Sequence, residues 1–242
     1  MTLVNPDAYQ ALAFPDGGMT LQGVLAVENN ETMRLVNTIT NQGTLRVRST
    51  GNTSTLFIGE DGATTVSLTG NGNGDVKLGD APAFTSFARI AENPGGATLT
   101  IAKNLIHGFG DLGSFNRQLT VVNHDRVSAD AAGRALNVRA GLFNNTAGAL
   151  NAQSGGVLQL AVNTLTNTGS LIEAQANSTV RFQATDLVTG GTLKNANNTF
   201  IEANGSFELG SATLANLALQ GAFVVKDSTA LRLDGTIEKT AV

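Results

Sequence analysis

The 242-residue sequence predicts an all-β fold, a parallel β-helix (β-solenoid) with roughly 22 residues per coil. Three observations predict this fold. One segment repeats without gaps at a fixed shift, and short runs alternate apolar with polar residues. The residues that bound these runs are the turn formers Asn, Gly, Thr and Ser.

The clearest repeat places residues 143–160 over residues 165–182. The first segment reads FNNTAGALNAQSGGVLQL and the second reads LTNTGSLIEAQANSTVRF, a shift of about 22 residues. Fainter copies begin near residues 41 and 123, and the second of these lacks its glycine. Asparagines at equivalent corners can stack their amides along the axis. We therefore predict structural corner or ladder positions at Asn41, Gly43, Asn123, Asn145, Asn167, Gly169 and Gly191.

Short strands with one buried face are predicted by the period-two runs, because successive side chains of a strand point to opposite faces. Examples are the apolar pairs Leu45/Val47, Val66/Leu68, Leu99/Ile101, Leu136/Val138 and Leu158/Leu160. The best helix candidates, residues 83–91 and 128–139, are short, and Gly133 interrupts the second. We expect little or no long helix.

The repeat distinguishes a solenoid from three other folds with short strands. A β-sandwich gives no reason for a gapless repeat, and a propeller blade needs about 40 residues or more. The ladder of a leucine-rich repeat is absent from the sequence. Residues 1–40 match no copy, so they are expected to form an N-terminal cap or irregular first coils. Residues 41–242 are expected to form the β-helix and to continue in a longer parent, since 231–237 still resemble a coil.

Composition and charge argue against two classes of partner, nucleic acids and membranes. The formal net charge is −4 and only 14% of residues are charged, without a basic stripe, which argues against nucleic-acid binding. No run of about 18 apolar residues occurs, so no membrane insertion by this segment is expected. The chain has no cysteine, and residues 1–7 lack the features of a signal peptide.

A family resemblance rests on residues 104–113 (NLIHGFGDLG), the strand LTVVN at 119–123, and the corner GGTL at 190–193. The copies at 145–152 and 167–174 belong to the same pattern. The set resembles the repeats of large secreted bacterial proteins, namely filamentous-haemagglutinin-like adhesins and autotransporter passengers. The resemblance implies a right-handed parallel β-helix that acts in adhesion, biofilm formation or surface display. Its departures are residues 124–126, where a glycine is expected, and residues 1–40.

The expected function is therefore a structural or adhesive solenoid segment of a secreted bacterial surface protein. It would lie outside the cell or on its surface, without a cofactor, and display faces for a host or matrix glycan or protein, or for end-to-end self-association. The alternative is a polysaccharide-degrading lyase or hydrolase, tailspike-like, on a pectin-lyase-type β-helix, which needs clustered acids on one outer face. The outward acids include Glu173, Asp186, Glu202 and Glu208. The repeat places Asn151, Glu173 and Asn195 at equivalent positions of successive coils, so acids are not expected to stack. An enzyme is therefore not the preferred interpretation.

Other motifs have simpler explanations. Residues 59–62 and 70–75 suggest calcium loops, but the ligand spacing fails and turn glycines are expected. Residues 108–113 read G-x-G-x-x-G, yet a strand pattern follows instead of a helix, so a corner is predicted. The two histidines, His107 and His124, have no third ligand and are predicted to be polar corner residues.

Overall fold

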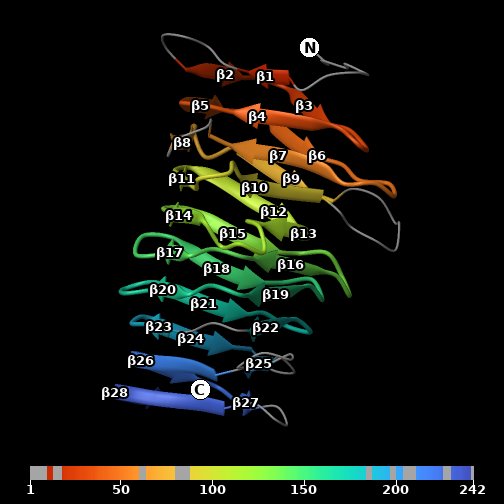
Figure 1. Cartoon of the computed structure of the whole chain (residues 1–242). Helices are drawn as coiled ribbons and strands as arrows, with labels where there is room; N and C mark the ends of the chain where they lie inside the picture. Colours follow the sequence, from red (N-terminus) through yellow and green to blue (C-terminus); the bar gives the residue numbers. More distant parts are fainter. Residues whose placement is uncertain are drawn as a thin grey trace.

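The computed structural model describes residues 10–12, 18–59, 64–79, 88–183, 187–196, 200–203, 211–225 and 230–240. Within these ranges every regular element is a β-strand, and all the strand pairs are parallel. Figure 1 shows the coils stacked along one axis, with the chain progressing from one end of the stack to the other. The predicted parallel β-solenoid is confirmed.

Three columns of strands build the stack. The first column is a ten-stranded sheet. Its strands are β1 (Gln10–Leu12), β4 (Thr32–Leu35), β7 (Ser54–Ile58), β10 (Ala88–Glu92), β13 (Gly110–Leu112), β16 (Ala135–Val138), β19 (Val157–Leu160), β22 (Thr179–Phe182), β25 (Phe200–Ala203) and β27 (Phe223–Val225).

The other two columns share an 18-stranded sheet. The second column contains β2 (Met19–Leu21), β5 (Thr38–Asn41), β8 (Thr64–Thr69), β11 (Ala97–Ile101), β14 (Leu119–Asn123), β17 (Leu142–Asn144), β20 (Thr164–Thr166) and β23 (Leu187–Thr189). The third contains β3 (Val24–Val27), β6 (Thr44–Val47), β9 (Gly74–Leu78), β12 (Asn104–Gly108), β15 (Arg126–Ala129), β18 (Ala149–Ala152), β21 (Leu171–Ala174) and β24 (Thr192–Asn195). The long strands β26 (Ser211–Gln220) and β28 (Ala230–Thr240) span both columns.

The register follows the sequence repeat through the middle of the chain. Phe143 pairs with Leu165, and Leu160 pairs with Phe182, as the alignment predicts. The alignment is wrong from β23 onward, because Leu165 pairs with Val188, 23 residues later, and Glu173 pairs with Lys194, 21 residues later. The chain reaches β23 one residue late, and the corner at 190–191 is then two residues shorter than the corner at 167–170 in the previous coil.

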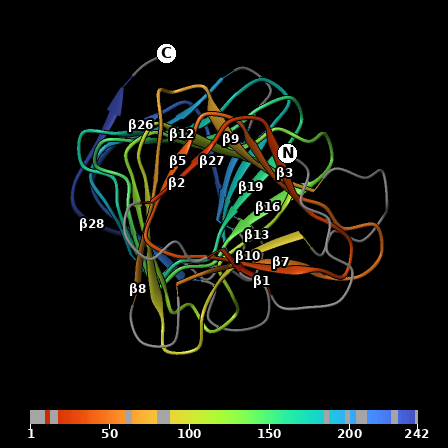
Figure 2. The same ribbon diagram turned by 90° about the horizontal axis from the view of Figure 1, so that it is seen from above.

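Inward side chains form apolar ladders, one rung per coil. In the second column each rung pairs with the next and is fully buried: Val66, Leu99, Val121, Phe143, Leu165, Val188 and Leu214. Figure 2, a view from the end of the stack, shows the strands of the three columns surrounding one interior. Alternation puts the intervening side chains outside, where they are free to form polar contacts.

The described part of residues 1–40 belongs to the same stack. Leu25 of β3 pairs with Leu45, and Met33 of β4 pairs with Leu56. Both helix candidates are wrong where the structure describes them, because residues 88–92 form β10 and the segment 128–139 contains the end of β15 and all of β16; residues 83–87 lie outside the described ranges. No helix in the described part of the chain is long and apolar enough to cross a bilayer.

Candidate functional site: polar links between coils

A ladder of buried asparagines runs along the corner between the second and third columns. Asn123 Nδ2 donates to Asn145 Oδ1 over 2.7 Å, and Asn145 Nδ2 donates to Asn167 Oδ1 over the same distance. All three residues are fully buried. Since a buried amide is costly unless it is hydrogen-bonded, each rung satisfies the next and ties three coils together.

Glycines beside this ladder have two different roles. Gly169 and Gly191 have backbone φ angles of +74° and +72°, which residues other than glycine rarely adopt. A Cβ at Gly169 would meet nothing within 4 Å, so only its backbone conformation demands glycine. A Cβ at Gly191 would lie 2.1 Å from the Asn167 carbonyl oxygen and 2.3 Å from its Nδ2, so this position needs glycine for space as well.

Asn41 belongs to a separate pair. Its Nδ2 donates to Oδ1 of Asn104 over 2.8 Å, and its Oδ1 accepts from the backbone N–H of Gly43 at 3.1 Å. Asn41 and Asn104 are 63 residues apart, with one coil between them. That coil has Gly74 at the contact, where a Cβ would lie 2.7 Å from Asn104 Oδ1. Asn104, the first residue of the NLIHG segment, is thus a ladder position that was not among those predicted from the sequence.

The imidazole of His107, in β12, lies between two carboxylates on the outer face of the third column. Its Nδ1 is 2.8 Å from Asp130 Oδ2, and its Nε2 is 3.1 Å from Asp75 Oδ2. Asp75 lies in β9, and Asp130 directly follows β15; β12 pairs with both strands. Asp75, His107 and Asp130, here called the histidine link, therefore connect three consecutive coils. The prediction that His107 is a corner residue is wrong, because His107 lies within strand β12. The same prediction is confirmed for His124, which is exposed on the turn after β14.

In the histidine link, the imidazole and the two carboxylates each favour the charged form of the other. Hydrogen bonds to Asp130 and Asp75 raise the pKa of His107 from 6.5 to about 9, against a smaller lowering by desolvation. Burial raises the pKa of Asp75, but hydrogen bonds from His107 and Thr44 and nearby positive charge lower it overall. Burial also raises the pKa of Asp130, and the His107 ring with backbone N–H groups lowers it overall. At neutral pH the link is an imidazolium between two carboxylates.

A shallow cleft of about 340 Å³ lies beside the histidine link. Its lining is Lys77, Gly79, His107, Gly108, Phe109, Asp130 and Ala131. His107 and Asp130 are bound to each other there, and Lys77 also has an interaction of its own. The polar groups of the cleft are thus already engaged within the protein.

The histidine link is poorly suited to catalysis. A general base needs a nitrogen lone pair, but both ring nitrogens of His107 face carboxylates. A glycosidase acid needs a raised carboxyl pKa, and those of Asp75 and Asp130 are lowered. The geometry instead suits a structural clamp.

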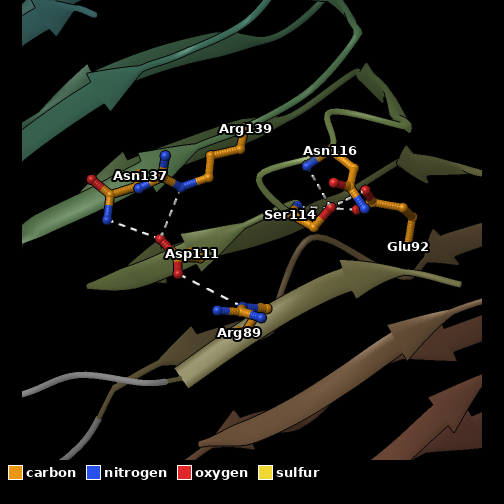
Figure 3. Close-up of polar contacts among 7 residues, drawn as sticks. All are labelled: Arg89, Glu92, Asp111, Ser114, Asn116, Asn137 and Arg139. Carbon is orange, nitrogen blue, oxygen red and sulfur yellow. Dashed lines mark hydrogen bonds and ion pairs between the residues drawn. The ribbon is translucent and has the colours of Figure 1, made fainter. Parts of the chain in front are cut away.

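A second link crosses the outer face of the ten-stranded sheet (Figure 3). Asp111 in β13 accepts from Asn137 Nδ2 at 2.9 Å, and its Oδ1 is 3.4 Å from Arg139 Nε. Its Oδ2 is 3.7 Å from Arg89 Nε in β10. Arg89, Asp111, Asn137 and Arg139, here called the arginine link, join β10, β13 and the end of β16. These residues could not be predicted from the sequence, because nothing in the repeat distinguishes one outward polar position from another.

The turn after β13 carries an exposed aromatic ring. The buried Glu92 carboxylate accepts from the backbone N–H of Ser114 at 3.0 Å and also bonds the Ser114 hydroxyl (Figure 3). It accepts from the backbone N–H of Gln118 at 3.2 Å as well. Arg139 stacks 4.0 Å from the centroid of Phe115. Phe115 is nevertheless 71% exposed. The turn is therefore held rigidly while its ring faces solvent.

Other candidates from the sequence have ordinary partners where the structure describes them. Glu173 forms an ion pair with Lys194 at 2.8 Å, and Asp75 of the 70–75 segment bonds Thr44 at 2.6 Å as well as His107. Asp186, Glu208 and residues 60–62 lie outside the described residues, as does the side chain of Glu202. Over the described ranges, no group of three His, Cys, Asp or Glu residues is placed to hold a metal ion.

Comparison of the chain with protein-family models, curated proteins and solved structures finds no match.

Proposed function

We propose that this chain is a structural and adhesive segment of a secreted bacterial surface protein, whose rod displays its outer faces for attachment to a cell or matrix. The observation that carries the proposal is the continuous parallel stack, tied between neighbouring coils inside by asparagines and outside by the two links. In a solenoid each repeat contacts only its neighbours, so such ties determine how well the rod keeps its shape. The family resemblance of residues 104–123 supports an extracellular location.

The attachment part of the proposal is supported by Phe115. An aromatic ring on a rigid turn supplies contact area at little entropic cost, which favours binding. Arg139 stacks on the Phe115 ring, and Arg117, two residues later in the same turn, donates a hydrogen bond of 2.9 Å to Asn163. We therefore propose the Phe115 turn as the attachment point for a matrix glycan, because a sugar presents both apolar C–H faces and hydroxyl groups.

The attachment proposal is tested by binding the purified chain to immobilised matrix glycans. Phe115→Ala should weaken binding by about tenfold or more, the loss expected for a contact residue worth about 1.4 kcal/mol. Val24→Ala, at a position that is 45% exposed at the start of β3, is the matched control and should bind like wild type. Binding to matrix proteins alone would replace the glycan with a protein partner, and release of reducing sugar would favour the enzyme alternative.

The structural part has separate tests. Ten stacked strands at about 4.8 Å spacing make a rod roughly 45 Å long in the first sheet, which small-angle scattering can measure. Light scattering over a concentration series tests self-assembly, and a constant monomer mass would contradict it. A chain that scatters as a compact sphere would contradict the rod itself.

A further inference from the structure

The histidine link and the arginine link hold the same three coils on two different faces. β9 and β10 are consecutive in the chain, as are β12 and β13, and β15 and β16. Each coil therefore contributes one strand to each link. In the histidine link the cation is central, between Asp75 and Asp130; in the arginine link the anion Asp111 is central.

The two links differ in what happens when a proton leaves. An arginine side chain stays protonated at any pH that proteins tolerate, so the arginine link keeps its cations in alkaline solution. A neutral imidazole has one N–H and one lone pair. Without its proton, His107 can donate to only one carboxylate and presents a lone pair to the other.

We propose that the histidine link is a proton-dependent clamp that lets the third column open locally in alkaline solution, while the arginine link keeps the ten-stranded sheet closed. Opening at one face is physically reasonable because solenoid coils are stabilised by local contacts and can separate locally. The segments most directly affected are β9 and the end of β15, because Asp75 and Asp130 join them to His107 of β12.

The direction of the pH effect follows from the His107 pKa, which is raised from 6.5 to about 9. A group with a raised folded pKa stabilises the fold fully below the unfolded pKa, and this stabilisation is lost as pH rises through the folded pKa. The loss therefore spans pH 6.5 to about 9. Both aspartates have lowered pKa values and stay charged over this window, so the ring is the group of the link that changes.

Other charged side chains lie near the histidine link. Lys77 of β9 pairs with His107, Arg126 begins β15, and Arg46 of β6 contributes positive charge near Asp75. His107 nevertheless is the cation that bonds both aspartates. When it is neutral, the formal charge of the link changes from −1 to −2, and the aspartates repel each other with only one bond left to the ring.

Hydrogen exchange at pH 6.5 and pH 9.5, expressed as protection factors, tests the clamp on the whole chain. Wild type should lose protection at 74–78 and 126–129 by about tenfold or more, the free-energy equivalent of one pKa unit, while 135–138 in β16 change little. His107→Gln should show reduced protection at 126–129 already at pH 6.5, with little further loss at pH 9.5. His124→Gln, which removes the other histidine, should behave like wild type.

A titration of the wild-type His107 ring by NMR provides the second measurement and does not depend on a variant folding. A ring that titrates near pH 9 supports the clamp. A ring that titrates near pH 6.5, or equal loss of protection at 126–129 and 135–138, overturns it. Asp111→Asn gives the reciprocal control, because it should lower protection at 135–138 at both pH values.

Discussion

Asn145 accepts a hydrogen bond from Asn123 over 2.7 Å, and the two residues are 22 positions apart in the chain. One sequence period is therefore one step along the stack. The same spacing links Asn145 to Asn167, so the central rung uses both its oxygen and its nitrogen inside the protein. This corner is where the stability of the stack can be tested most directly.

Asn145→Ala should lower the free energy of unfolding by about 2–4 kcal/mol, because Asn123 Nδ2 and Asn167 Oδ1 both lose a buried partner. The control is Asn144→Ala, one residue away, whose half-buried Oδ1 accepts a turn N–H from Thr146 at 3.0 Å. The control should cost about 1 kcal/mol or less. Urea unfolding measures the loss of unfolding free energy in both variants. Equal losses would show that the asparagine ladder stabilises the fold no more than a turn hydrogen bond does.

Gly169→Ala and Gly191→Ala separate backbone strain from crowding. Both positions have φ above +70°, so each alanine should cost about 1–2 kcal/mol from its backbone conformation. Gly191→Ala should cost a further ~1–3 kcal/mol, because its Cβ overlaps Asn167. Thermal melting ranks the variants, and a Gly169 variant as unstable as the Gly191 variant would contradict the assigned crowding.

Phe143→Ala should destabilise the solenoid by about 3–5 kcal/mol, since Phe143 is fully buried between Val121 and Leu165 in the inward ladder. Phe115→Ala is the matched control at a ring that is 71% exposed. It loses the stacking with Arg139 and should cost less than about 1 kcal/mol. Guanidinium unfolding measures both, and a large loss in the Phe115 variant would also disqualify it as a binding probe.

Acid should weaken the histidine link by protonating its carboxylates. Because the pKa of Asp130 is lowered from 3.8, its contribution is present above pH 3.8 and is lost as pH falls through the lowered value. Asp130→Asn should be less stable than wild type at pH 6, by about 1 kcal/mol at most because solvent screens this half-buried carboxylate, and the difference should shrink as pH falls below 3.8.

Urea unfolding at several pH values measures this difference for Asp130→Asn. Asp125→Asn, on the neighbouring turn, is the control and should show no such convergence with wild type. A constant gap between Asp130→Asn and wild type at all pH values would mean that the carboxylate acts through packing and not through its charge.

The repeat and the alternation were sufficient to predict the fold and much of the register. In a parallel stack a residue's vertical neighbour is one coil later, so a gapless repeat is itself the register, as the Phe143–Leu165 pair shows. The prediction failed from β23 onward, where Val188 pairs one residue late with Leu165 and a shorter corner then places Lys194 opposite Glu173. Corner length changes the register without disturbing the alternation on either side, so the sequence pattern did not reveal it.

By itself, then, the sequence determined the solenoid, its period of about 22 residues and its inward apolar ladders, because these depend on a local pattern repeated along the chain. Only the tertiary structure decided which outward polar residues meet. His107 lies 32 residues from Asp75 and 23 from Asp130, and Asn41 lies 63 from Asn104. These separations depend on the lengths of individual corners and on side-chain reach across coils, neither of which follows from the repeat.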